Sequence, residues 1–354
     1  MAIDVFTPEV MDAVVRVLPP QDAFLKNMFF KNVKPEPTEK IRVDFYKGKR
    51  RVAPFVSPRN AAKASEKISY TSDEFITPMV KVKDVTNIED IMKRLPGELL
   101  MSSGMNPDDR AIQMLTMAMQ DFDEQITRRE EVMCRQILFE GKIDVIGEDV
   151  DYTIDLGFTN TDTLTLTDMW DDEASVADPI EDLKAWATEC MQKGYRKPNV
   201  CIMERSAYAA FVKRCKALNY FNQWNYLDIS IEPSMKSENV TYCGRLRDPD
   251  LEIYIYDEWY LDDWTTPGTI VEAPMVPKGK IMLASTNMKT SLYYGVMTFA
   301  DIITKTFRSV IGTRAADSWV QKEPAARFLT LNSRPLPIAH EIDSWFVAQV
   351  SKNA

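Results

Sequence analysis

Histidine is almost missing from the sequence, which contains a single one, His340, near the C-terminus. A histidine-based metal site needs a second histidine, and a histidine-activated nucleophile needs a serine or cysteine motif nearby. Neither is found around His340, so a packing or surface role is the simpler interpretation. We expect no catalytic residue, no metal ion and no cofactor.

Glycine and cysteine are also sparse. The 12 glycines leave little material for a phosphate-binding loop, and neither G-x-x-x-x-G-K-[ST] nor G-x-G-x-x-G occurs. The five cysteines are odd in number and form no C-x-x-C pair, which fits neither a disulfide framework nor a zinc site and favours a reducing compartment. No basic N-terminal region precedes an apolar run, and no window approaches 18 uninterrupted apolar residues. We expect no signal peptide and no membrane partner.

Basic charge is in deficit, because 43 Lys and Arg against 53 Asp and Glu give a net charge of −10. This argues against a general nucleic-acid binder, which needs a basic surface. The charge is also uneven: residues 40–67 carry nine basic and two acidic side chains, whereas residues 144–182 carry 13 acidic and no basic ones. Opposite charges on one chain favour head-to-tail contacts between copies. The alternative is that both runs are solvated or pair within one chain.

The most regular pattern in the sequence predicts one very long helix. Asn106-Pro107-Asp108-Asp109 combines a capping residue, a first-turn proline and two acids. Apolar residues then recur at steps of three and four, apart from one skipped position, until Gly141 and Lys142 end the pattern. They are Ile112, Leu115, Met119, Phe122, Ile126, Met133 and Ile137. A helix over 107–140 would be roughly 50 Å long, enough to form a spine across the subunit.

The other segments predict a mixed α+β chain of about two domains. A short helix from Thr7 ends at Pro19-Pro20, a second apolar stretch covers 23–30, and alternation around Ile41–Phe45 and Val52–Val56 is typical of a long hairpin turning at 47–51. Further helices are predicted around 180–191 and 206–218. Strands are predicted at 199–203, 251–256, 281–284, 292–299 and 328–331.

Several short sequence motifs, in order along the chain, resemble those of the lambda-type major capsid protein E family of tailed phages. They begin with Pro37-Thr38-Glu39-Lys40, Ala53-Pro54-Phe55-Val56-Ser57-Pro58, Glu74-Phe75 with Pro78, and Val80-Lys81-Val82-Lys83. They continue with Arg94-Leu95-Pro96-Gly97-Glu98, Leu138-Phe139-Glu140-Gly141-Lys142, Pro324-Ala325-Ala326-Arg327-Phe328, and Pro335-Leu336-Pro337 before a closing segment from Trp345 to Val350. These motifs run from about residue 35 to the end of the chain, whereas residues 219–250 match nothing in the family.

The resemblance implies an α+β, HK97-like capsid fold. Its parts would be an N-terminal arm (1–36), an extended β-hairpin loop (37–85), a peripheral domain (86–178) with the spine helix, an axial domain (179–295) and a return to the peripheral domain (296–354). It also implies self-assembly into hexamers and pentamers of an icosahedral head around DNA that is not bound sequence-specifically. Scaffolding, portal and decoration proteins would be partners, with assembly in the host cytoplasm and the mature protein in the virion capsid.

Two groups of residues are candidates for contacts between subunits. The basic cluster Lys47, Lys49, Arg50 and Arg51 would reach acidic groups on a neighbour, and the aromatic and acidic run with Asp257, Trp259, Asp262 and Asp263 would form a second contact. Two other functions stay open. Aromatics beside carboxylates also suit a glycosidase, although neighbouring residues on one strand face opposite ways. An encapsulin-like compartment would share the fold and enclose enzymes.

Overall fold

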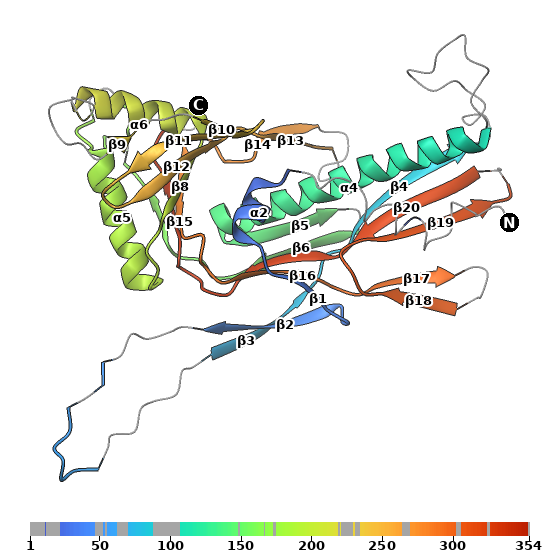
Figure 1. Cartoon of the computed structure of the whole chain (residues 1–354), viewed down its shortest axis with the longest axis horizontal. Helices are drawn as coiled ribbons and strands as arrows, with labels where there is room; N and C mark the ends of the chain where they lie inside the picture. Colours follow the sequence, from blue (N-terminus) through green and yellow to red (C-terminus); the bar gives the residue numbers. More distant parts are fainter. Residues whose placement is uncertain are drawn as a thin grey trace.

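The computed structural model describes residues 11, 22–46, 52–53, 55–61, 70–87, 107–147, 149–165, 167–172, 175–218, 220, 229–230, 234–263, 270–301, 306–323 and 326–352. Figure 1 shows an elongated molecule with a large sheet and two helices at one end and one long helix that runs toward the other end. The mixture of helices and strands confirms the predicted α+β class. None of the helices in these ranges is both long and apolar enough to cross a membrane.

The long helix α4 (Pro107–Glu140) has the predicted bounds. Its apolar stripe is buried from Leu115 onward, with Met119 and Ile126 fully inaccessible to solvent, whereas Ile112 is 41% exposed. The helix ends at Gly141, which has a φ of +72° and bonds its N–H to the Ile137 carbonyl. A Cβ at Gly141 would lie 2.3 Å from the Phe158 Cβ, so both the backbone conformation and the space require glycine here.

The N-terminal half of α4 lies on a three-stranded sheet. This sheet has the order β19 (Ala315–Gln321), β20 (Ala326–Ser333) and β4 (Val80–Asn87). Leu329 and Leu331 alternate toward the helix and join its apolar stripe in one core. Met11, the one described residue of 1–21, is buried in the same core. The predicted helix from Thr7 otherwise lies outside the described residues.

Two further hydrophobic cores lie on the two faces of an eight-stranded sheet. Its strands are β7 (Thr161–Thr163), β8 (Val200–Met203), β9 (Ile229–Ser230), β10 (Ser234–Ser237), β11 (Val240–Leu246), β12 (Leu251–Tyr256), β15 (Lys280–Ala284) and β22 (Phe346–Gln349). On β8, Cys201 and Met203 face helices α5 (Pro179–Lys193) and α6 (Arg205–Ala217), whereas Val200 and Ile202 face the core shared with α4. The Asp178 side chain caps α5 by accepting the Ile180 N–H at 3.0 Å.

This sheet includes strands from outside the predicted axial segment. Strand β22 pairs with β15 on one side and with β7 on the other. Both β22 and β7 lie outside the predicted axial segment 179–295. The apolar side chains of Phe346 and Ala348 are buried under α5 and α6. The unit built on the sheet therefore draws on three separate parts of the chain.

A small sheet lies where the N-terminal segment crosses the body. It joins β1 (Val33–Pro35), β16 (Thr290–Tyr294) and β21 (Pro335–Ala339). The single strand predicted at 292–299 is wrong: the chain breaks at Gly295 into β16 and β17 (Met297–Asp301), which pairs with β18 (Thr306–Val310). A Cβ placed on Gly295 would lie 2.3 Å from Thr77 Oγ1, so no side chain fits at this position.

Candidate assembly surfaces

The extended hairpin consists of β2 (Lys40–Tyr46) and β3 (Tyr70–Ile76), and it lies at the edge of the molecule (Figure 1). Its ladder runs from Lys40 opposite Ile76 to Tyr46 opposite Tyr70. The segment 52–56 predicted as the second strand is therefore not the partner of β2, and its described residues are exposed. Because the ladder closes at Tyr46 and Tyr70, residues 47–69 connect the two strands.

The base of this hairpin is held by the body of the subunit. Arg334 donates hydrogen bonds of 3.2 Å to the carbonyls of Thr77 and Val296, and its guanidinium lies 2.8 Å from the Glu39 carboxylate. The His340 ring makes a 3.0 Å hydrogen bond with Ser291 Oγ and another with the backbone of Asp44. Burial first, and then the charge of Lys34, lowers the pKa of His340. The lone histidine thus packs the hairpin against the body.

The four predicted contact residues of the basic cluster, Lys47, Lys49, Arg50 and Arg51, lie outside the described residues. Within the described strands of the hairpin, Arg42 pairs with Glu74 across the ladder at 2.8 Å. In the parts of the chain that the structure describes, no residue of the hairpin forms an ion pair with the acidic stretch 144–182.

The aromatic and acidic run forms a second hairpin, β13 (Trp259–Asp262) with β14 (Val271–Pro274). Its inner side is bound to α4: Asp262 lies 3.2 Å from Arg129, and the Tyr260 ring lies below the guanidinium of Arg135, 5.9 Å from ring centroid to Cζ. Its outer side leaves Trp259 52% and Leu261 57% exposed. We call the exposed side chains of Trp259, Leu261 and Asp263 the outer face of β13–β14.

The structure separates the four predicted residues of this run. Asp257 pairs with Arg205 of α6 and Asp262 with Arg129 of α4, so both carboxylates are neutralised within their own chain. Trp259 and Asp263 are exposed. A glycosidase needs one carboxylic acid and one carboxylate facing a shared sugar, and two carboxylates bound to arginines on different helices do not provide this arrangement.

A charged network is buried where α4 crosses the N-terminal helix α2 (Phe24–Phe29). The Glu130 carboxylate is inaccessible to solvent and accepts 2.6 Å bonds from both Lys26 Nζ and Arg314 Nη1. Arg314 also binds Asp123 at 2.8 Å. Burial raises the pKa of Glu130, but the charges of Arg314 and Lys26 outweigh it and hold that pKa below its ordinary value. Glu130 is therefore an ionised group at the centre of the subunit.

The pKa of the next residue, Glu131, is shifted in the opposite direction. Its carboxyl group accepts the N–H groups of Leu25 at 2.7 Å and Lys26 at 2.9 Å, and so caps α2, whose own N-cap residue gives no side-chain bond. Burial raises the pKa of Glu131 to about 7. The Tyr256 hydroxyl contacts the carboxyl groups of both Glu131 and Glu258. The hydroxyl has a single hydrogen and can donate it to only one of them. A proton on one carboxyl group lets that group donate to the Tyr256 oxygen, so both contacts become hydrogen bonds.

One feature of the sequence indicates this buried charged network, although the apolar periodicity of α4 alone does not explain it. The position skipped in the apolar stripe of α4 falls between Ile126 and Met133, where the spacing allows either Arg129 or Glu130, and the structure buries Glu130. A charged residue inside an apolar stripe predicts a buried partner. Its partners, Lys26 and Arg314, are distant in sequence and carry no local mark. In the described residues, no group of three or more His, Cys, Asp or Glu could hold a metal ion.

A family model described as phage major capsid protein E matches residues 7–350. The chain belongs to the phage major capsid protein E family. The major capsid protein of Escherichia phage lambda is 22% identical over 337 residues, covering 93% of this chain and 94% of that protein. The major capsid protein of Escherichia phage N15 is 22% identical over 92% of this chain and 93% of that protein.

Two solved structures share the fold of this chain. A prophage capsid protein from E. coli CFT073 superposes with a TM-score of 0.70 at 17% identity, covering 97% of this chain and 99% of that one. A phage-related protein from Bordetella bronchiseptica RB50 gives a TM-score of 0.51 at 11% identity, with 96% of both chains covered. These likenesses show the fold, and the predicted HK97-like capsid fold is confirmed. As a member of the family, the chain is a major capsid protein of tailed phages with a structural role.

Proposed function

We propose that copies of this chain assemble into the hexamers and pentamers of an icosahedral head that encloses double-stranded DNA, and that the chain catalyses no reaction. The observation that carries the proposal is the match of the capsid family over residues 7–350. An encapsulin-like shell around enzymes is a weaker alternative, because the family that matches is one of phage capsid proteins.

Two surfaces would join neighbouring subunits. The extended hairpin, with a local charge of +7 over residues 40–67, would lie over a neighbour and bring Lys47, Lys49, Arg50 and Arg51 to its acidic groups. The outer face of β13–β14 would form a smaller apolar contact around Trp259, with Asp257 and Asp262 fixing the hairpin to its own subunit. An isolated two-stranded hairpin is only marginally stable in water, so contact with a neighbouring subunit would stabilise the extended hairpin during assembly.

Each segment of the chain would form a different part of the capsid subunit. We assign the arm to 1–36, the extended loop to 37–85 and the peripheral domain to 86–178 with the return from 296. The axial domain would be 179–295, completed by β7 and β22. The net charge of −10 would let DNA be packed without sequence-specific binding. Scaffolding, portal and decoration proteins would be partners, and assembly would take place in the host cytoplasm.

Negative-stain electron microscopy of the purified chain, produced with and without its neighbouring genes, tests the proposal. We expect closed shells, or rings and tubes of regular subunits. Uniform small particles at every protein and salt concentration would contradict a shell function.

A charge-reversal variant tests the role of the hairpin. Replacing Lys49→Glu, Arg50→Glu and Arg51→Glu should abolish closed shells, because the hairpin would then repel the acidic groups of a neighbour. The circular dichroism spectrum and unfolding midpoint of the monomer should stay unchanged. Normal shells from this variant would exclude the basic cluster as an assembly contact.

A further inference from the structure

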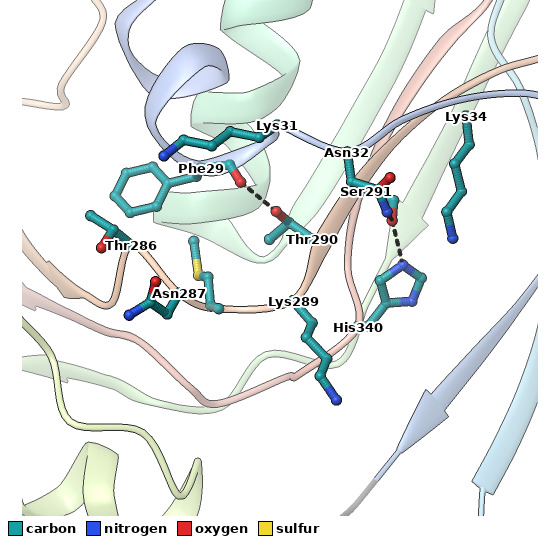
Figure 2. A pocket seen from close by; sticks show the side chains of 11 residues that line it. Phe29, Lys31, Asn32, Lys34, Thr286, Asn287, Lys289, Thr290, Ser291 and His340 are labelled. Carbon is teal, nitrogen blue, oxygen red and sulfur yellow. Dashed lines mark hydrogen bonds between the residues drawn. The ribbon is translucent and has the colours of Figure 1, made fainter.

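A basic cavity lies where the N-terminal segment crosses β16 (Figure 2). It has a volume of about 510 Å³, within the range of ordinary binding pockets. Lys31, Lys34 and Lys289 line it, together with the apolar side chains of Phe29 and Met288. We call this cavity the lysine pocket. Its lining combines positive charge and apolar surface in a chain that is acidic as a whole.

The charges of the lysine pocket are poorly balanced by its own chain. Among the described residues, no carboxylate lies within 4 Å of the ammonium group of Lys31 or Lys34; Lys34 instead lies 5.3 Å from the centroid of the Tyr293 ring. Lys289 Nζ is 3.8 Å from Glu341, but Glu341 already accepts two 2.8 Å bonds from Arg196. The pocket is therefore suited to an acidic group from outside the subunit.

The same chain exposes a hairpin with complementary properties. β5 (Lys142–Gly147) and β6 (Val150–Asp155) pair with Ile146 opposite Asp151, so these two side chains share one face. Ile146 is 47% and Val150 41% exposed, and the exposed carboxylates of Asp149 and Asp151 make no hydrogen bond or ion pair with another described residue. The tip of this hairpin thus carries two exposed carboxylates, and one of them, that of Asp151, lies beside the exposed aliphatic side chain of Ile146. These negative charges complement the three lysines of the lysine pocket.

We propose that the lysine pocket receives the tip of the β5–β6 hairpin of a second copy of the chain, with the carboxylates of Asp149 and Asp151 among the three lysines. The contact rests on the proposed function, and it names a partner surface beyond the two hairpins described above. Pocket and tip are different surfaces of one molecule, so the contact is head-to-tail and repeats around a ring. The His340 ring lies in the pocket wall and contacts the backbone of Asp44 in β2, which places this contact beside the extended hairpin.

Zero-length carbodiimide cross-linking of assembled particles tests the pairing directly. Particles would be assembled from equal amounts of ¹⁴N- and ¹⁵N-labelled chain, because only links between different copies give mixed-isotope peptides. We expect mixed-isotope links from Lys31, Lys34 or Lys289 to Asp149 or Asp151. Particles in which these lysines link only to other acids, or to none, would overturn the pairing and leave the shell function intact. Failure to form particles at all would overturn both.

A charge-swap experiment tests whether the contact matters for assembly. Lys31→Glu, Lys34→Glu and Lys289→Glu together should slow assembly, followed by light scattering, by about tenfold or more. A matched control with Lys213→Glu, Lys216→Glu and Lys322→Glu changes the net charge equally at exposed positions that do not line the pocket, and should assemble at nearly the normal rate. Adding Asp149→Lys and Asp151→Lys to the pocket variant should restore assembly. Equal slowing in the control, or no rescue by the swap, would overturn the proposal.

Discussion

Acidic and basic side chains meet in two different settings in this subunit. At the crossing of α2 and α4, the side chains of Arg314 and Glu130 are 10% and 0% exposed. On the extended hairpin, those of Arg42 and Glu74 are 71% and 54% exposed. Both pairs have short N···O distances, yet water screens only the second pair, and exposed pairs contribute about 0–1 kcal/mol. Short distances alone therefore do not tell which charges hold the subunit together.

The difference suggests a division between charges that fix the monomer and charges that are available to neighbours. Breaking a buried pair leaves a charge without water or partner, and this destabilises a protein by about 3–5 kcal/mol. Exposed charges can change partners at little cost, because water solvates them in either state. The three predictions below test this division from the largest expected effect to the smallest.

Removing the central carboxylate should have the largest effect. In Glu130→Ala, both Lys26 and Arg314 lose their common partner, and we expect the free energy of unfolding to fall by about 3–5 kcal/mol. Urea denaturation of the monomer measures it. The matched control, Glu74→Ala on the extended hairpin, should lower it by less than about 1 kcal/mol. Equal losses in the two variants would remove the distinction between the two settings.

The neighbouring glutamate should make stability depend on pH. The folded chain keeps a proton on Glu131 up to about pH 7, whereas the unfolded chain releases it near 4.5. The folded state therefore binds more protons between these values, and the free energy of unfolding should fall by roughly 3 kcal/mol as the pH rises from 4.5 to 7. Glu130, whose pKa is lowered, loses its contribution only when the pH falls below its ordinary value.

Glu131→Gln isolates this effect, because the amide stays neutral at every pH. The lowered pKa of His340 acts in the opposite direction, so the quantity to measure is the difference between wild type and variant in urea midpoints from pH 4.5 to 8. The stability of wild type relative to the variant should decline across this window. A difference that does not change with pH would show that Glu131 is ionised in the folded chain.

Much of the fold could be predicted from the sequence because its signals are local. Pro107, the apolar stripe and Gly141 mark the bounds of α4, and Asp178-Pro179 starts α5. Pairings between distant segments gave no such signal. The sequence could not predict that β22 would join β15, since a buried apolar strand fits several sheets equally well.

The candidate contacts were only partly predictable for the same reason. The run from Asp257 to Asp263 was found from its composition, but which of its side chains face outward depends on Arg205 and Arg129, which come from two different helices. The lysine pocket was not predicted, because Lys31 and Lys34 come from the N-terminal segment and Lys289 from the loop before β16. Only the folded chain brings them to one cavity.

The smallest effect on the monomer is expected at the outer face of β13–β14. Trp259→Ser with Leu261→Ser should change the free energy of unfolding by less than about 0.5 kcal/mol, because both side chains are more than half exposed. If they are buried between subunits, the protein concentration at which shells first form should rise about tenfold for each 1.4 kcal/mol lost, measurable by sedimentation. Met235→Ser, at another exposed apolar position, is the control and should leave that concentration unchanged. An equal rise in both variants would mean that general surface hydrophobicity, and not this hairpin, sets the onset of assembly.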